Sequence, residues 1–167
     1  MMENAEDGRA KVKEILDDAG FVMLATRSAD GRYHARPMAV AACDEDGVLW
    51  FLTDRRSIKA DELARDSEVL VTVADESHDN YLSLGGTASL QTDRPTIDRL
   101  WSEPARAWFP NGKDDPGIAA LRIDIDIAEY WDVSSSTLVQ LYGYAKAVIT
   151  GERAHTGEAS DNATVRF

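Results

Sequence analysis

The chain has 167 residues, of which 44% are apolar and 29% charged, so it is long enough for one domain with its own core. Its net charge of −12, without any basic stripe, excludes a general nucleic-acid binder. The single cysteine, Cys43, excludes an internal disulfide. No apolar run approaches the roughly 18 residues that span a membrane, and the sequence shows no signal-peptide pattern. We therefore expect a cytoplasmic protein.

The N-terminal third predicts one helix followed by short strands. The helix spans 5–19, where apolar residues recur at helical spacing: Val12, Ile15, Leu16 and Ala19. Three strand-like runs follow, separated by the turn sequences ADGR and DEDG; they begin at Phe21, Arg32 and Gly47. Ser57 is placed to cap a short helix over 58–65.

The rest of the chain predicts three more strands and two helices. A β-branched strand begins at Glu68, and Gly85 and Gly86 within the next strand indicate a bulge or a close backbone approach. Asp93 is expected to cap the following helix. The next strand alternates apolar and charged residues, with four apolar side chains on its inner face: Leu121, Ile123, Ile125 and Ile127.

A last helix is predicted through 138–148, ending at Gly151, and the final sixteen residues read as a polar, poorly packed tail. About six strands joined mostly by short turns do not fit a parallel sheet. We therefore predict a mainly β fold of the α+β class, a six-stranded antiparallel barrel with helices at both ends and between strands. Its domain covers 1–151, and the tail covers 152–167.

Most kinds of catalytic site have no support in the sequence. The histidines His34, His78 and His155 are too scattered for a metal site, and nucleophile-elbow, dinucleotide and P-loop motifs are absent. Cys43 ends an apolar strand and is expected to be buried and inert. The neighbouring carboxylates Asp124 and Asp126 are expected on an exposed strand face.

One basic cluster remains, formed by Arg55, Arg56 and Lys59 around the start of the short helix. Positive charge is unfavourable at a helix N-terminus, so these residues are either solvated surface charges paired with neighbouring carboxylates (Asp54, Asp61 or Glu62) or an anion site. The hydroxyls of Thr53 and Ser57 and the free N–H groups of the helix favour a phosphate there. Arg36 adds a bidentate donor if its strand pairs across the DEDG turn.

These residues resemble a known family. The stretches ARPMAV and FLTDRRSIKADEL resemble the flavin-binding core of the pyridoxamine 5′-phosphate oxidase-like split β-barrels. The later stretches DRPTIDRLW, AWFPNGKDDPG and AEYWD resemble the general stress protein 26 branch of that superfamily. The resemblance implies a Greek-key flavin-binding domain in which four residues bind the FMN phosphate and ribityl chain: Arg36, Thr53, Ser57 and Lys59.

The resemblance also implies a homodimer with two flavins at the subunit interface, with FMN expected before FAD. The flavin ring would lie against backbone of six residues: Arg36, Pro37, Met38, Phe51, Leu52 and Thr53. Trp108 and Phe109 would wall the pocket from the partner subunit, or would pack in the core of their own chain.

Two departures from true pyridoxamine phosphate oxidases matter for function. Ala41 stands where those enzymes carry a second basic residue, and VSSST after Trp131 replaces their basic substrate motif. Flavin binding therefore carries over, whereas oxidation of pyridoxamine phosphate does not. The sequence leaves three functions open: a flavin-dependent oxidoreductase of unknown substrate, a non-enzymatic flavin carrier or store in a stress response, and a barrel that binds haem or deazaflavin.

Overall fold

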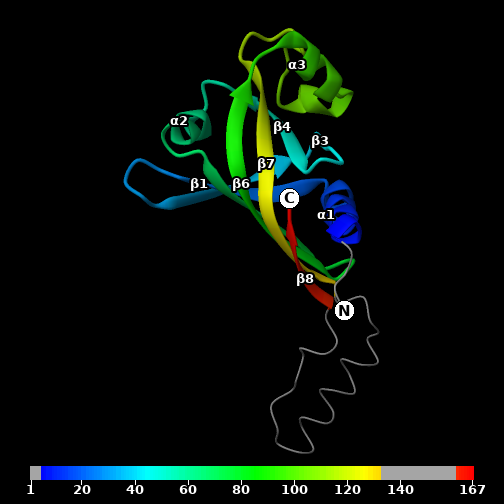
Figure 1. The fold of residues 1–167 in the computed structure, drawn as a ribbon. Helices are drawn as coiled ribbons and strands as arrows, with labels where there is room; N and C mark the ends of the chain where they lie inside the picture. Colours follow the sequence, from blue (N-terminus) through cyan, green and yellow to red (C-terminus); the bar gives the residue numbers. More distant parts are fainter. Residues whose placement is uncertain (1–4, 133–160) are drawn as a thin grey trace, which may run out of the picture.

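The computed structural model describes residues 5–132 and 161–167 (Figure 1). None of the helices within these residues is long and apolar enough to cross a membrane. In chain order the elements are α1 (Ala5–Ala19), β1 (Phe21–Arg27), β2 (Tyr33–Ala39), β3 (Ala42–Cys43), β4 (Val48–Asp54), α2 (Ile58–Arg65), β5 (Glu68–Asp75), β6 (Asn80–Gln91), α3 (Arg94–Leu100), the 3-10 helix η1 (Glu103–Ala107), β7 (Ile118–Asp132) and β8 (Asp161–Arg166).

The strands form one antiparallel sheet in the order β2-β1-β5-β6-β7-β4-β3, and β8 pairs with β7 off this path. The chain between β2 and β3 connects the two ends of this order. The N–H of Val40 donates to the carbonyl of Gly20 at 2.9 Å, and that of Ala41 donates to the carbonyl of Trp50 at 2.9 Å. The sheet therefore curls into a half-barrel (Figure 1), which confirms the predicted split-barrel fold class.

The described residues contain eight strands where six were predicted. The strand predicted from Arg32 breaks at Val40, and its last part is the two-residue β3. The other addition, β8, lies in the predicted tail, and its Val165 is buried. The prediction of a poorly packed tail is thus wrong for residues 161–167. Their short alternation of apolar and polar residues is easily overlooked within a polar stretch. Residues 152–160, the helix predicted through 138–148 and the boundary at 151 lie outside the described residues.

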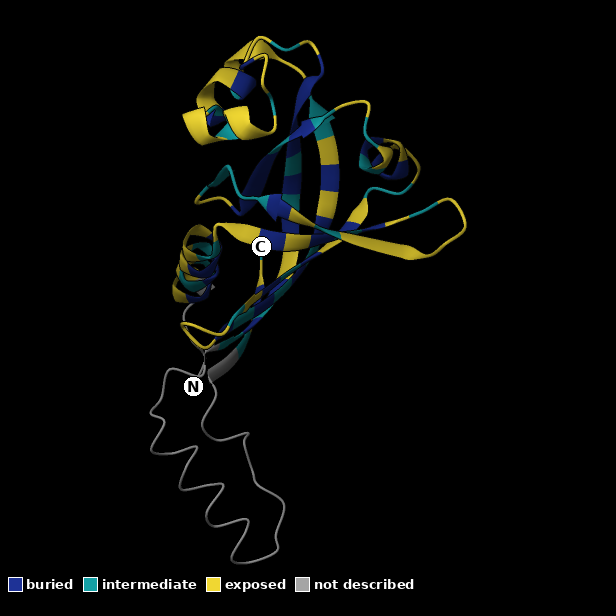
Figure 2. Ribbon diagram, turned by 180° about the vertical axis from the view of Figure 1, so that it is seen from behind, coloured by how far each residue is buried: buried dark blue, intermediate teal, exposed yellow. Residues whose placement is uncertain are grey.

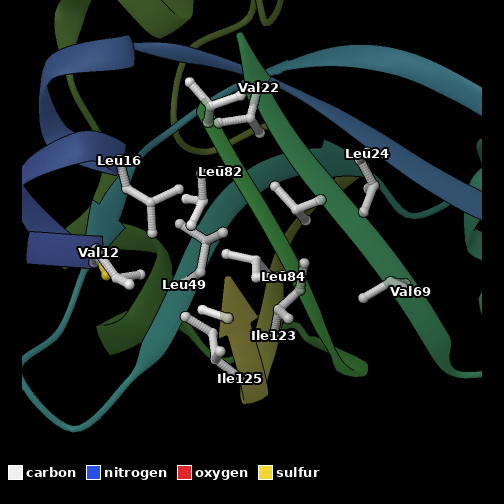
Figure 3. Packing of buried hydrophobic residues seen from close by; sticks show 14 of the residues in the cluster. Val12, Leu16, Val22, Leu24, Leu49, Val69, Leu82, Leu84, Ile123 and Ile125 are labelled. Carbon is white, nitrogen blue, oxygen red and sulfur yellow. The ribbon is translucent and has the colours of Figure 1, made fainter. Parts of the chain in front are cut away.

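The core fills the inner face of the half-barrel, and α1 packs against it. Val12, Ile15 and Leu16 are almost fully buried, which confirms the predicted helix and its inward face. Figure 3 shows Leu16 in one cluster with Leu49 of β4 and Leu82 of β6. Seen from behind, the strands alternate buried and exposed residues along their length (Figure 2), as expected for a sheet with one face on the core.

The predicted bulge lies where β6 meets β7. Gly85 pairs with Ile127 and Gly86 pairs with Ile125, so Asp126 is an extra residue on β7. Beyond the bulge, the buried and exposed positions of β7 change places. Ile125 is buried, whereas the side chain of Ile127 faces outward and the residue is 41% exposed. The bulge is confirmed, and the predicted inward position of Ile127 is wrong for the same reason.

We expect Gly86→Ala to destabilise the protein strongly and Gly85→Ala to do so only slightly. A Cβ at Gly86 would lie 2.4 Å from the backbone oxygen of Asp124, which cannot move without breaking the sheet. At Gly85 the nearest atom would be a side-chain methyl of Ile127 at 3.6 Å, an ordinary contact. A drop of at least about 2 kcal/mol in the free energy of unfolding, measured in urea, is expected for Gly86→Ala alone. Equal losses in the two variants would contradict the close approach.

Candidate functional site

The first turn of α2 carries Lys59, a lysine that forms no ion pair among the described residues. The Nζ of Lys59 donates to the Oγ of Ser57 at 3.2 Å. Burial lowers the pKa of Lys59 below its ordinary 10.5, the positive charge of Arg36 lowers it further, and only the attraction of Asp54 opposes this. No carboxylate in the described part of the chain forms an ion pair with Lys59. A partly desolvated cation beside another cation suits an external anion.

The hydroxyl of Ser57 adjoins this lysine, and a second hydroxyl, that of Thr53, lies near the end of β4, before the turn into α2. Ser57 occupies the predicted N-cap position of α2, but its side chain makes no capping hydrogen bond. Thr53, near the end of β4, is only 3% exposed, and its Oγ1 has no hydrogen-bond partner among the described residues. A tight turn joins the two, since the N–H of Ser57 donates to the carbonyl of Asp54 at 3.1 Å. Buried hydroxyls are rarely left unpaired, so Thr53 has capacity for a ligand.

The other two cations of the basic cluster are exposed on the surface. Arg56 is exposed and forms hydrogen bonds of 3.1 Å with both carboxylate oxygens of Asp54. Arg55 is exposed as well. The solvated alternative is therefore correct for Arg56, and the cluster that looked uniform in sequence separates into a half-buried Lys59 and two surface arginines.

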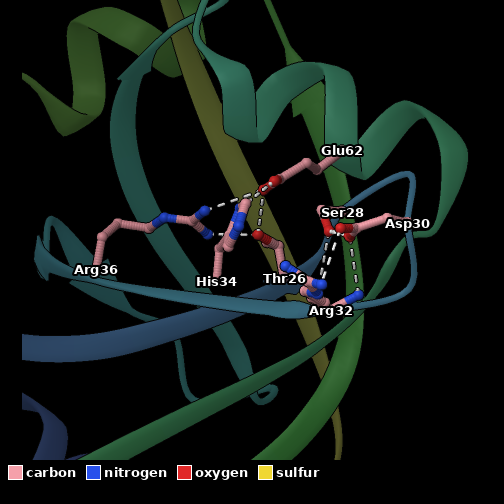
Figure 4. A network of polar contacts seen from close by, with 7 residues as sticks. All are labelled: Thr26, Ser28, Asp30, Arg32, His34, Arg36 and Glu62. Carbon is pink, nitrogen blue, oxygen red and sulfur yellow. Dashed lines mark hydrogen bonds and ion pairs between the residues drawn. The ribbon is translucent and has the colours of Figure 1, made fainter.

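Arg36 belongs to a polar network around a buried carboxylate (Figure 4). The side chain of Glu62 on α2 is 3% exposed. Its Oε2 accepts hydrogen bonds from Thr26 Oγ1 at 2.6 Å and from Arg36 Nη2 at 3.0 Å, and its Oε1 lies 2.7 Å from His34 Nδ1. Arg36 also donates to the hydroxyl of Thr26. Burial raises the pKa of Glu62, but these hydrogen bonds together bring the pKa below its ordinary 4.5, so the carboxylate is ionised at neutral pH.

Local sequence patterns do not identify Glu62 and Thr26 as site residues, and the predicted route of Arg36 to the site is wrong. β2 pairs with β1 and not across the DEDG turn with β4, whose neighbours are β3 and β7. Arg36 reaches α2 because the sheet curls. One signal was available: Glu62 precedes Leu63 on the inward side of a short helix, where a carboxylate needs partners.

The residues expected to face a flavin ring offer different groups. The side chains of Met38 and Phe51 are buried in the core cluster, so only their backbone is available to a ligand. Pro37 is exposed, and Leu52 is partly buried. The expected contact of the flavin ring with the backbone of these residues stays a prediction.

Trp108 is on the surface of its own chain. It is 59% exposed, and its ring centroid lies 6.0 Å from that of Phe21, at the start of β1. Phe109 is partly buried. Core packing within the same chain is therefore excluded for Trp108.

The remaining candidate residues are structural. Cys43 is buried, as predicted, and burial raises the pKa of its thiol to about 11, which makes it unreactive at neutral pH. Asp124 accepts hydrogen bonds of 2.6–3.1 Å from Arg122 and so is not half of a proton-sharing pair with Asp126. Among the residues described, no three His, Cys, Asp or Glu side chains gather as a metal site.

The pyridoxamine 5′-phosphate oxidase like family model matches residues 7–155, which is most of the chain. The chain belongs to this family. The match covers the half-barrel from α1 to β7, including every residue of the arrangement around Glu62 and Lys59. The family predicted from ARPMAV and FLTDRRSIKADEL is thereby confirmed.

Similar proteins place this family member near the general stress protein 26 group. Protein bli-3 of Neurospora crassa is 30% identical over 144 residues, which cover 80% of this chain and 69% of that protein. A structure from Jannaschia sp. CCS1 assigned to general stress protein 26 is 29% identical and covers 96% of this chain and 99% of its own, with a TM-score of 0.74. The general stress FMN/FAD binding protein of Xanthomonas citri is 32% identical over 78% of this chain and 92% of its own, with a TM-score of 0.68.

Proposed function

We propose that this protein binds FMN, with the phosphate held by Arg36 of β2, by Ser57 at the N-cap of α2 and by Lys59 in its first turn, and with Thr53 facing the ribityl chain. The observation that carries the proposal is Lys59, a half-buried ammonium beside a second cation and without a carboxylate partner in the described residues. The hydroxyl of Thr53, which has no partner in the described part of the chain, supports it, as does the likeness to the FMN/FAD binding protein of Xanthomonas citri.

The flavin would supply the redox chemistry, whereas this chain would bind and orient it. Backbone groups of Pro37, Met38 and Leu52 would face the ring, since the core holds the side chain of Met38 and also that of Phe51. Two cations then face a phosphate that carries about −1.5 to −2 charge at neutral pH.

Titration of the protein with FMN tests this proposal, because binding quenches flavin fluorescence. We expect saturable binding with a Kd below about 100 μM, which corresponds to roughly 5.5 kcal/mol. Riboflavin, which lacks the phosphate, should bind more weakly. FAD in a parallel titration tests the choice between the two phosphorylated flavins. Absence of saturation by FMN over this range would refute the proposal, and absorbance of the purified protein would reveal haem or deazaflavin instead.

We further propose that the bound flavin serves a cytoplasmic oxidoreductase. Steady oxidation of NADH or NADPH by the FMN-loaded protein supports this activity, and its absence favours a flavin carrier or store. Pyridoxamine phosphate should not be a substrate. Ala41, which packs beside Trp50, offers no positive charge to the phosphate group of that compound.

We propose that the protein is a homodimer, formed through the outer face of the sheet. Leu70, Gly85 and Ile127 are consecutive partners across β5, β6 and β7, and the two apolar side chains of this row are exposed. Met23 and Phe21 on β1 are exposed as well, the latter beside Trp108. Such a group of apolar side chains is typical of an interface.

Light scattering at micromolar concentration should therefore give about twice the chain mass of 18.4 kDa. A charge in this row, as in Leu70→Glu, should shift the mass to that of one chain, because the buried charge would lack a partner. The matched control is Glu68→Gln, at an exposed position of the same strand that is already polar. A single-chain mass for the unaltered protein would contradict the dimer.

A further inference from the structure

We infer that Glu62 is a positioning residue that holds Arg36 and α2 in the arrangement required by an anion. This inference rests on the proposed flavin phosphate site and adds a residue that makes no contact with the phosphate itself. Glu62 is almost fully buried, and its three side-chain partners among the described residues come from β1 and β2 (Figure 4).

The carboxylate joins the two elements that would share the phosphate. Arg36 lies on β2, whereas Ser57 and Lys59 lie at the start of α2. Glu62 is one helical turn after Lys59, and its Oε2 receives Arg36 at 3.0 Å. The contact therefore fixes the position of the guanidinium relative to the start of α2.

Arg36 keeps donors for a ligand while it is held. A guanidinium has five N–H groups, and the contacts with Thr26 and Glu62 occupy one on Nη1 and one on Nη2. The Nε–H and the second hydrogens of both Nη atoms remain for an anion. Thr26 is itself anchored, since its hydroxyl donates to the same Oε2 at 2.6 Å.

Charge explains why such an anchor is needed. Arg36 and Lys59 are close enough for the charge of Arg36 to lower the pKa of Lys59, so the two repel each other when no anion is bound. Without Glu62, Arg36 would relieve this repulsion by turning toward solvent, to which its side chain is already 24% exposed. Binding an anion would then require ordering a long side chain again.

The negative charge of Glu62 also has an opposite effect, since it repels an anion. Positioning and repulsion predict opposite changes in anion affinity when a substitution removes only the charge of Glu62. If positioning dominates, Glu62→Gln weakens phosphate binding, and if repulsion dominates, it strengthens it. We assign the larger effect to positioning, because the ion pair with Arg36 at 3.0 Å offsets the charge of Glu62.

The experiment compares FMN with riboflavin in titrations of Glu62→Gln. We expect the Kd for FMN to rise about tenfold, because a neutral amide holds the guanidinium less firmly, and the Kd for riboflavin to stay within about twofold. The matched control is Asp61→Asn, which removes a carboxylate from an exposed position of the same helix and should leave both Kd values unchanged. A general loss of structure would weaken both ligands equally and would therefore be recognised.

A second comparison shows whether Glu62 acts through Arg36. In an Arg36→Met background, Glu62→Gln should no longer lower FMN affinity. If Glu62→Gln does not fold, Thr26→Val replaces it, since it removes the hydroxyl that anchors both groups and keeps the side-chain shape. Any of three results would overturn the inference. Glu62→Gln could bind FMN more strongly, or Glu62→Gln and Thr26→Val could leave the ratio of the FMN and riboflavin Kd values unchanged. Glu62→Gln could also lower FMN affinity by the same factor in the Arg36→Met background. A wild-type protein that does not distinguish FMN from riboflavin would instead refute the proposed function.

Discussion

Arg36→Met should both weaken FMN binding and destabilise the protein without ligand. FMN should bind roughly 100-fold more weakly, because a charge-assisted pair of hydrogen bonds to phosphate is lost. The fold should lose about 2–4 kcal/mol, because Glu62 remains buried and, among the described residues, keeps only Thr26 and His34 as hydrogen-bond partners. The melting temperature should fall by roughly 5–15 °C.

The stability lost in Arg36→Met should also depend on pH. In the wild-type protein the pKa of Glu62 is below its ordinary 4.5, so its contacts stabilise the fold at neutral pH and this contribution is lost as pH falls through the folded-state pKa. Without Arg36 the charged form of Glu62 is less favourable and takes up its proton at higher pH. The difference in stability between wild type and variant should therefore shrink on acidification.

The double variant Arg36→Met with Glu62→Gln completes this test. Neutralising the carboxylate removes the unpaired buried charge, so the double variant should be more stable than Arg36→Met alone, although each single change destabilises. Urea unfolding of the four proteins measures the coupling. Additive losses would show that Arg36 and Glu62 do not stabilise each other.

Lys59→Met should weaken FMN roughly 10- to 100-fold and leave riboflavin nearly unaffected. The charge of Lys59 does not stabilise the fold, because burial and Arg36 lower its pKa. A lysine with a lowered pKa opposes folding at every pH at which it is protonated, including neutral pH. The variant without ligand should therefore be as stable as the wild type or slightly more stable, since methionine retains the apolar stem. Fluorescence titration and thermal unfolding measure the two effects.

Arg55→Met is the matched control for Lys59→Met. It removes the same charge four positions earlier from an exposed side chain. If the two variants weaken FMN equally, or if Lys59→Met weakens riboflavin as much as FMN, the cluster acts only as general surface charge.

Local sequence patterns predicted the elements of this fold well and its long-range contacts poorly. The spacing from Val12 to Ala19 and the residues around Ser57 predicted α1 and α2 with the bounds that the structure has. The pairing of β2 with β1 and the route of Arg36 to α2 depend on the curl of the whole sheet, which no window of residues contains. The reversal at Ile127 depends likewise on a bulge against another strand.

The candidate site shows the same division. Ser57 and Lys59 are recognisable because they are neighbours at a helix start. Glu62, Thr26 and His34 come together only through tertiary structure, and a glutamate next to Leu63 on a short helix gives a weak signal by itself. The position of Arg56 also depends on geometry, because its guanidinium is hydrogen-bonded to Asp54.

The two-residue link at Val40 and Ala41 has a consequence for how the half-barrel closes. Joining the two ends of a sheet by a long loop costs chain entropy that grows with the logarithm of loop length. Here the link has no slack, since each of its N–H groups is bonded to a different strand or turn. The distance between the C-terminal end of β2 and the middle of β4 is therefore held by this two-residue stretch of backbone and by its main-chain hydrogen bonds.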